Sequence, residues 1–181
     1  MNEVTAIALF PTLVFVVDVP EYKDLLPEVY KLQRQDPTGM QASNMGGWHS
    51  QWVDIPELVQ EYIPFENYIG TAWYMINQSM HGNFSHVHPR NDWSGVLWLR
   101  VPEQTNSLLE FEHPDLFAQY QCMDSVSKIA PDIQKQYNYW QSYKFPPKEG
   151  TMLMFPASLR HHVHFNQSED TRIALSFNIK L

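Results

Sequence analysis

The C-terminal stretch Arg172-Ile-Ala-Leu-Ser-Phe-Asn-Ile-Lys-Leu181 alternates between two kinds of position. One set holds Ile173, Leu175, Phe177, Ile179 and Leu181, and the other holds Arg172, Ala174, Ser176, Asn178 and Lys180. Successive side chains of a strand point to opposite faces, so this period of two predicts a half-buried strand. The pattern leaves open whether the polar face meets solvent or lines a polar cavity.

Short strand-like runs of the same character fill the chain after Gly70, separated by Pro, Asn and Gly. The predicted strands are Ala72–Asn77, Phe84–His88, Gly95–Val101, Ser107–Phe111, Tyr137–Tyr143, Thr151–Phe155, His161–Phe165 and Thr171–Leu181. Many short strands of this kind predict a mainly β fold: a sandwich, a jelly roll or a barrel.

The N-terminal third has a different pattern. Apolar residues at helical spacing predict an amphipathic helix over Glu21–Gln35, and Pro56 precedes a second short helix over Glu57–Ile63. The other expected elements are a strand pair or bent strand over Ala6–Val17, a Gly-rich loop over Ala42–Ser50 with Trp48 as a core anchor, and a loop with a helical turn over Asp115–Lys135. We therefore expect helices packed on a β-rich remainder.

Composition fits one globular domain over residues 1–181, with 44% hydrophobic and 18% charged residues. A net charge of −8 opposes binding to nucleic acid. The single cysteine, Cys122, excludes an internal disulfide and a cysteine-rich zinc site, and fits a reducing compartment. The apolar run Val4–Val19 has no basic start and is too short to span a bilayer, so we expect a soluble cytoplasmic protein with no membrane partner.

Two histidines stand two residues apart in Ser85-His86-Val87-His88-Pro89. In extended backbone, residues i and i+2 share a face. Two neutral imidazoles on one face can chelate a divalent metal if a third ligand arrives from elsewhere in the chain.

Three histidines near the C-terminus could supply that ligand. His161 shares a strand face with apolar residues, while His162 and His164 fall on the other face and look solvent-exposed. His161 is therefore the preferred partner, although His162-Val163-His164 repeats the His-x-His pattern and forms a competing set. Spacing alone is also consistent with hydrogen-bonded core histidines that bind no metal.

Several motifs in order resemble the 2-oxoglutarate/iron(II)-dependent oxygenases, in a small group found in bacteria and phages. They are Leu9-Phe10-Pro11-Thr12, Ser43-Asn44-Met45-Gly46-Gly47-Trp48-His49-Ser50, His86-Val87-His88-Pro89, Ser94-Gly95-Val96, Phe155-Pro156-Ala157-Ser158-Leu159-Arg160-His161 and Arg172-Ile173-Ala174-Leu175-Ser176-Phe177-Asn178. Together they extend over almost the whole chain.

The resemblance implies a double-stranded β-helix (jelly roll) with Fe(II) held at one open end. By position, His86 and His88 match the early ligand pair, His161 matches the distal ligand, and Arg172 matches the residue that binds the far carboxylate of the cosubstrate 2-oxoglutarate. A guanidinium suits this role because its rigid fork binds carboxylate bidentately. Further cosubstrate-pocket candidates are Ser176, Asn178, Asn77 and Asn83.

One position departs from the family pattern. The superfamily places a carboxylate two residues after the first histidine, whereas this chain has His88. A third histidine removes one negative charge from the metal. Asp92 could supply a carboxylate if the chain turns after Pro89, and we rank His88 above it.

The leading functional prediction is a dioxygenase that uses Fe(II), 2-oxoglutarate and O2 to hydroxylate a substrate, with release of succinate and CO2. The His88 departure favours an alternative, a cupin-like metal-binding protein that binds a small molecule or catalyses a non-oxidative reaction. A purely structural β-sandwich is a third interpretation. The N-terminal helices and exposed aromatic residues allow for a homodimer contact.

Overall fold

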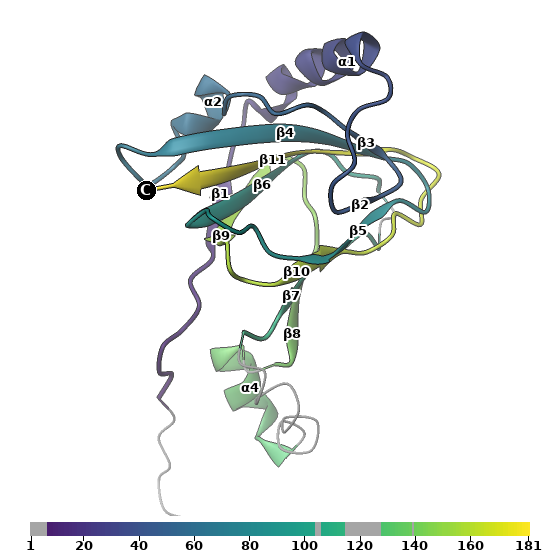
Figure 1. Ribbon diagram of the computed structural model, residues 1–181. Coiled ribbons are helices and arrows are strands. Elements are labelled where there is room, and N and C mark those ends of the chain that lie inside the picture. The colour runs from purple at the N-terminus through teal and green to yellow at the C-terminus, as the bar shows by residue number, and fades with distance from the viewer. Residues whose placement is uncertain (1–6, 104–105, 115–127, 139) are drawn as a thin grey trace, which may run out of the picture.

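The strands form two antiparallel sheets that face each other in the computed structural model, which describes residues 7–103, 106–114, 128–138 and 140–181 (Figure 1). The larger sheet has the order β1 (Phe15–Asp18), β9 (Thr151–Pro156), β6 (Trp93–Arg100), β11 (Arg172–Lys180), β4 (Ile69–Asn77) and β3 (Trp48–His49). The smaller sheet has the order β2 (Asn44–Met45), β5 (Gly82–His86), β10 (His161–Val163), β7 (Leu109–Glu112) and β8 (Ser142–Phe145). This confirms the predicted jelly roll.

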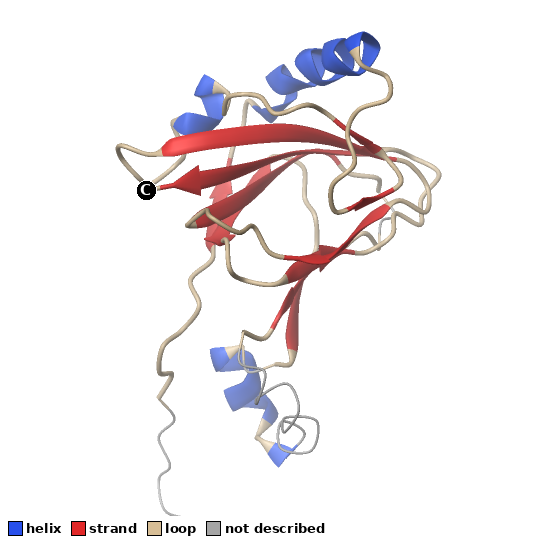
Figure 2. Cartoon of the chain, viewed as in Figure 1, coloured by secondary structure: helices blue, strands red, loops and turns tan. Residues whose placement is uncertain are grey.

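The N-terminal helices cover the outer face of the larger sheet (Figure 2). They are the 3-10 helix η1 (Tyr22–Leu25), α1 (Leu26–Gln35) and α2 (Glu57–Gln60). Both helices predicted in this region are confirmed, although the second is shorter than expected. Helix α4 (Pro131–Tyr137) lies apart from them, between β7 and β8 in the chain. None of the helices in the described part of the chain has the length and apolar character needed to span a bilayer.

The central strand β11 separates two apolar layers. Ile173, Leu175, Phe177 and Ile179 pack with the helices, in a core that includes Val29, Val59 and Trp48. Ala174, on the opposite face, packs with residues of the smaller sheet such as Leu109 and Phe111. The alternate positions of β11 that carry polar side chains therefore face the space between the sheets. The sequence left open what the polar face meets. Both faces are buried because the helices cover one of them and the smaller sheet covers the other.

A two-glycine turn joins the two sheets. Gly46 and Gly47 have φ values of +68° and +75°, and they connect β2 of the smaller sheet to β3 of the larger one. Glycine adopts such left-handed conformations without steric cost. Trp48 follows directly, is buried, and donates from Nε1 to the carbonyl oxygen of Asp36 at 2.7 Å. The prediction of a Gly-rich loop with Trp48 as a core anchor is confirmed.

Two predicted elements are wrong. The strand expected over Ala6–Val17 begins only at Phe15. Residues 7–14 form no strand and are exposed except for the partly buried Val14; the earlier residues lie outside the described part. Without a partner strand, apolar composition alone does not make a strand. The strand expected over Tyr137–Tyr143 is displaced to β8, because the chain is helical up to Tyr137. Most of the loop expected over Asp115–Lys135, with Cys122, lies outside the described residues.

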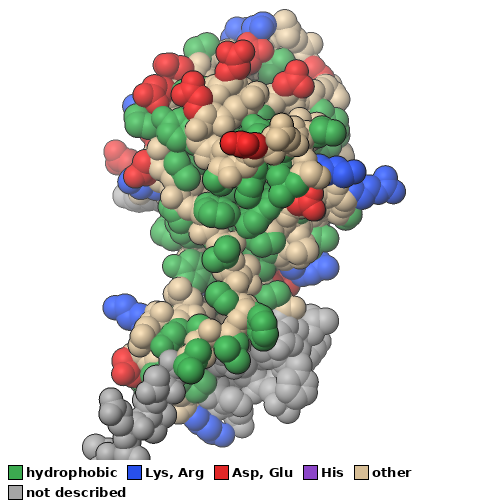
Figure 3. All heavy atoms as spheres, turned by 90° about the vertical axis from the view of Figure 1, so that its left-hand side faces the viewer, with side chains coloured by type: hydrophobic (Ala, Val, Ile, Leu, Met, Phe, Trp, Pro, Cys, Tyr) green, Lys and Arg blue, Asp and Glu red, His purple; other side chains and the backbone are tan. Residues whose placement is uncertain are grey.

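Apolar and charged side chains are unevenly spread over the surface. Figure 3 shows apolar side chains gathered on the face that carries the C-terminus, and acidic side chains concentrated above them, toward the helices. Exposed apolar residues near the end of β11 include Leu181 and Ile69, the register partner of Lys180.

Candidate metal centre

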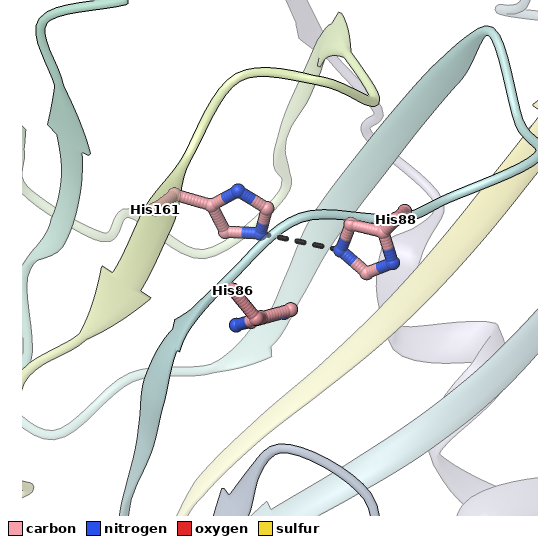
Figure 4. A group of neighbouring side chains, drawn as sticks. All are labelled: His86, His88 and His161. Atoms are coloured by element: carbon pink, nitrogen blue, oxygen red, sulfur yellow. Dashed lines mark hydrogen bonds between the residues drawn. The ribbon is translucent and has the colours of Figure 1, made fainter. Parts of the chain in front are cut away.

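Three imidazoles converge between the two sheets. His86 ends β5, His88 lies two residues beyond it, and His161 begins β10, where it is the register partner of His86 (Figure 4). The Nε2 atoms of His88 and His161 are 3.2 Å apart, and all three histidines offer ligand atoms within 4.8 Å of one another. The preferred histidine set from the sequence is thus brought together at one point.

Backbone hydrogen bonds fix two of the rings. The Nδ1–H of His86 donates to the carbonyl oxygen of Phe84, and the Nδ1–H of His161 donates to that of Leu159, each at 2.7 Å. With the proton on Nδ1, each Nε2 presents a lone pair, which is the form that binds a metal. Outer hydrogen bonds of this kind are typical of histidine ligands.

Burial keeps the three rings neutral. It is the main cause that lowers the pKa of His88 to about 4 and that of His161 to about 3, and it also lowers the pKa of His86. A histidine must lose its proton before it binds a metal at that nitrogen. At neutral pH, protons therefore do not compete with a cation for this set, and the donor atoms fit a divalent metal.

Arg172 lies in the same pocket, buried at the start of β11. Its Nη2 donates to Asn77 Oδ1 at 2.9 Å and its Nη1 donates to Ser107 Oγ, while Nε is buried and has no hydrogen-bond partner in the described part of the chain. Within the described residues, its polar contacts are to neutral groups and no carboxylate forms an ion pair with it. Burial lowers the pKa of Arg172 to about 10, which still leaves it charged at neutral pH.

The remaining predicted residues divide into those that line this pocket and those that do not. Ser176 and Asn83 line it with the histidines. Asn77 acts on it through Arg172, as described above. Asn178 is buried but accepts from Ser94 Oγ at 2.8 Å and is not a lining residue. Asp92 accepts from the backbone N–H of Leu181 at 2.9 Å and lies outside the histidine cluster.

Sequence reasoning missed an aromatic group beside His88. Trp73 is buried, and its ring lines the pocket with its centroid 5.8 Å from that of His88. His49 stacks on Trp73 at 5.7 Å, and the half-exposed Trp52 meets Trp73 edge-on at 5.0 Å. Strand alternation in β4 was the available signal, because Trp73, Met75 and Asn77 share the inward face.

Sequence comparison matches this chain to one family model. The model carries the description "Putative 2OG-Fe(II) oxygenase" and matches residues 71–178, which contain all three histidines and Arg172. A comparison with curated protein sequences finds no match.

Solved structures with a similar fold include several hydroxylases. A prolyl-4-hydroxylase from Pseudomonas putida is 12% identical, with 93% of this chain and 92% of that chain covered and a TM-score of 0.61. A prolyl hydroxylase from Trichoplax adhaerens, in complex with a hypoxia inducible factor peptide, is 11% identical, with 92% and 83% covered and a TM-score of 0.60. A viral collagen prolyl hydroxylase from Paramecium Bursaria Chlorella virus-1 is 12% identical, with 99% and 97% covered and a TM-score of 0.54. These likenesses are in fold.

Proposed function

The chain belongs to the 2-oxoglutarate/Fe(II) oxygenase family, and on this premise we propose that His86, His88 and His161 hold the iron and Arg172 binds the distal carboxylate of 2-oxoglutarate. The family match makes the protein an oxidoreductase that uses Fe(II), 2-oxoglutarate and O2. The assignment of these roles to individual residues, and hydroxylation as the reaction, are our proposal.

The buried charge of Arg172 carries the proposal. A guanidinium taken out of water is costly unless an anion compensates it. The described residues around Arg172 supply only neutral acceptors, from Asn77 and Ser107. A carboxylate of a bound ligand would complete the pair by a charge-assisted, bidentate contact. 2-Oxoglutarate has such a carboxylate at the end opposite its metal-binding keto acid.

The histidine cluster and the Arg172 guanidinium line the same pocket. When bound, Fe(II) supplies the oxidative decarboxylation of 2-oxoglutarate to succinate and CO2 and the transfer of oxygen to a substrate C–H bond. The three imidazoles fix the position of the metal, Arg172 orients the cosubstrate, and Ser176 offers a hydroxyl to it. Trp73 and Trp98 line the pocket with apolar surface that keeps water away.

His88 gives the site an all-neutral ligand set. Of the two candidates from the sequence, the geometry favours His88, because its ring lies in the cluster whereas Asp92 binds the C-terminal backbone. Relative to a set with one carboxylate, three imidazoles leave one more positive charge on the metal. We infer that the dianionic cosubstrate is attracted by both this charge and Arg172.

Succinate formation from 2-oxoglutarate without added substrate tests the proposal. We expect the wild-type protein with Fe(II) and O2 to form succinate slowly, and His161→Ala to abolish this activity. Full turnover by His161→Ala would overturn the ligand assignment. Under anaerobic conditions, Fe(II) and 2-oxoglutarate should give a visible charge-transfer band. A folded, metal-loaded protein without that band would instead favour the cupin-like alternative.

A further inference from the structure

Strand β10 carries histidines on both of its faces. His161 points into the pocket described above, so its neighbour His162 points to the outer face of the smaller sheet, and His164 follows on that outer side. Glu110 of β7 is the register partner of His162. Two imidazoles and a carboxylate therefore meet on the outside of the sheet.

These three side chains are close enough to share one ion. His164 Nε2 lies 2.6 Å from Glu110 Oε2, and His162 Nε2 lies 3.5 Å from the same oxygen. The two imidazole rings are stacked, with centroids 5.0 Å apart and planes 21° from parallel. The ligand atoms of all three residues lie within 4.8 Å of one another.

We propose that Glu110, His162 and His164 form a second divalent-metal site, separate from the iron site and on the opposite face of β10. Two imidazole nitrogens and one carboxylate oxygen are a donor set that Zn(II) accepts in tetrahedral geometry, with water as the fourth ligand. Zinc–ligand bonds of about 2.0–2.2 Å place ligand atoms about 3–3.5 Å apart, so binding requires the Glu110–His164 contact to open slightly.

A neighbouring carboxylate supports this assignment. The Nδ1 atom of His162 is buried and has no hydrogen-bond partner among the described residues, and Glu112 Oε1 lies 3.8 Å away. A carboxylate that accepts from the second nitrogen of a metal-bound histidine is a common outer contact of zinc sites. Glu112 is itself held by Ser85, whose hydroxyl donates to Oε1. A small movement of His162 would complete this contact.

Lys144 is the competing cation. Its Nζ lies 3.7 Å from Glu110 Oε2, across the β7–β8 pair. Without a metal, Lys144 and the two histidines form an ordinary polar network around Glu110. The Lys144 side chain is 53% exposed, whereas that of Glu110 is only 14% exposed. Lys144 can therefore withdraw into solvent when a divalent ion takes its place.

Zinc counting after equilibrium dialysis of the full chain tests the second site. Wild-type protein should bind two Zn(II) ions per chain. His162→Gln/His164→Gln should bind one, and the matched inner variant His88→Gln/His161→Gln should also bind one. Circular dichroism and thermal unfolding check that each variant is folded. An unchanged zinc count in the outer double variant, or no zinc bound by the inner variant, would overturn the proposal.

Cobalt(II) provides a second, spectroscopic measurement. Four-coordinate Co(II) absorbs visible light far more strongly than six-coordinate Co(II). The inner variant should keep intense four-coordinate bands, and these bands should disappear when His162→Gln/His164→Gln is added to it. Glu112→Gln should retain both metal ions, with an affinity at the outer site lowered about 10-fold or more. Absence of four-coordinate bands from the inner variant would contradict a tetrahedral outer site.

Discussion

Arg172 and Asn77 are register partners in β11 and β4, and they are joined by a 2.9 Å hydrogen bond from Nη2 to Oδ1. The neutral amide aims the guanidinium but leaves its charge uncompensated. The amide also has a buried Nδ2 that finds no hydrogen-bond partner among the residues that the structure describes, so hydrogen-bonding capacity in this pair is left unused. This relationship supports the proposed pairing of Arg172 with an anionic cosubstrate.

Asn77→Asp should weaken binding of 2-oxoglutarate, because an internal carboxylate would take the place of the ligand beside Arg172. We expect the KM for 2-oxoglutarate to rise about 10-fold or more, which corresponds to about 1.4 kcal/mol. Succinate formation at varied 2-oxoglutarate measures it. Asn77→Ala is the control, since it removes the acceptor without adding a charge, and it should have the smaller effect. An unchanged KM in Asn77→Asp would contradict the role given to Arg172.

Arg172→Gln should lose the two-point contact with the cosubstrate carboxylate. A hydrogen bond to a charged group contributes about 1.5–3 kcal/mol, so we expect affinity for 2-oxoglutarate to fall about 100-fold. Arg172→Lys keeps a charge but not the planar fork, so its affinity for 2-oxoglutarate should lie between those of the wild type and Arg172→Gln. Anaerobic titration with Fe(II) present measures both. Equal affinities in wild type and Arg172→Gln would refute the assignment, provided that thermal unfolding shows a folded variant.

His88→Asp should restore the ligand set typical of the superfamily and hold Fe(II) more tightly, because it adds a negative charge next to the cation. His88→Leu should bind Fe(II) more than 10-fold more weakly than wild type. Metal affinity measured by competition with a chelator distinguishes the three proteins. If His88→Leu binds Fe(II) as well as wild type, His88 is not a ligand.

The metal-free protein should lose stability as the pH falls from about 6.5 to about 4. His88 and His161 have pKa values of about 4 and about 3 in the folded state, whereas an unfolded histidine titrates near 6.5. In this window the unfolded chain binds more protons, so acid favours unfolding, and each histidine contributes up to about 1.4 kcal/mol per pH unit. Urea unfolding at several pH values checks it. The variant His88→Asn/His161→Asn should show a weaker slope between pH 6.5 and 5.

Gly95→Ala should destabilise the larger sheet. An added Cβ would lie 2.1 Å from Cζ of Phe177, its fully buried register partner in β11. Overpacking of this kind costs about 1–3 kcal/mol. The change in the free energy of unfolding in urea measures the cost, and Gly95→Ala/Phe177→Leu should recover part of it. A fully stable single variant would mean that the ring moves aside freely.

Strand periodicity carried most of what the sequence could predict. It chose His161 over His162 because only His161 shares a face with apolar neighbours, and the structure places His161 in the pocket. It also grouped the polar positions of β11 on one face, while it left open whether that face meets solvent or a cavity. The period of two indicates which face of a strand a residue occupies, but it does not indicate which element packs against that face.

The sequence could not predict which side chains pair across neighbouring strands. Asn178 shares the face of Arg172, yet it is bonded to Ser94 at the other end of β11. A face extends along the whole strand, whereas a pocket occupies only part of it. Ser107 contacts Arg172 from a segment 65 residues away in sequence, and no local sequence pattern predicts such a contact. The strand predicted to include residues 7–14 was wrong for a related reason, because strand formation depends on a partner strand.

The two halves of the pocket rest on strands of very different length. Both strands are paired on both sides, but Arg172 belongs to the nine-residue β11, whereas His161 begins the three-residue β10. Amide protons of long, doubly paired strands exchange with solvent only when large parts of a protein open, and short strands open more readily. Deuterium should therefore enter around His161 before it enters around Arg172, so that local opening releases the proposed distal metal ligand while the half proposed to bind the anion stays folded.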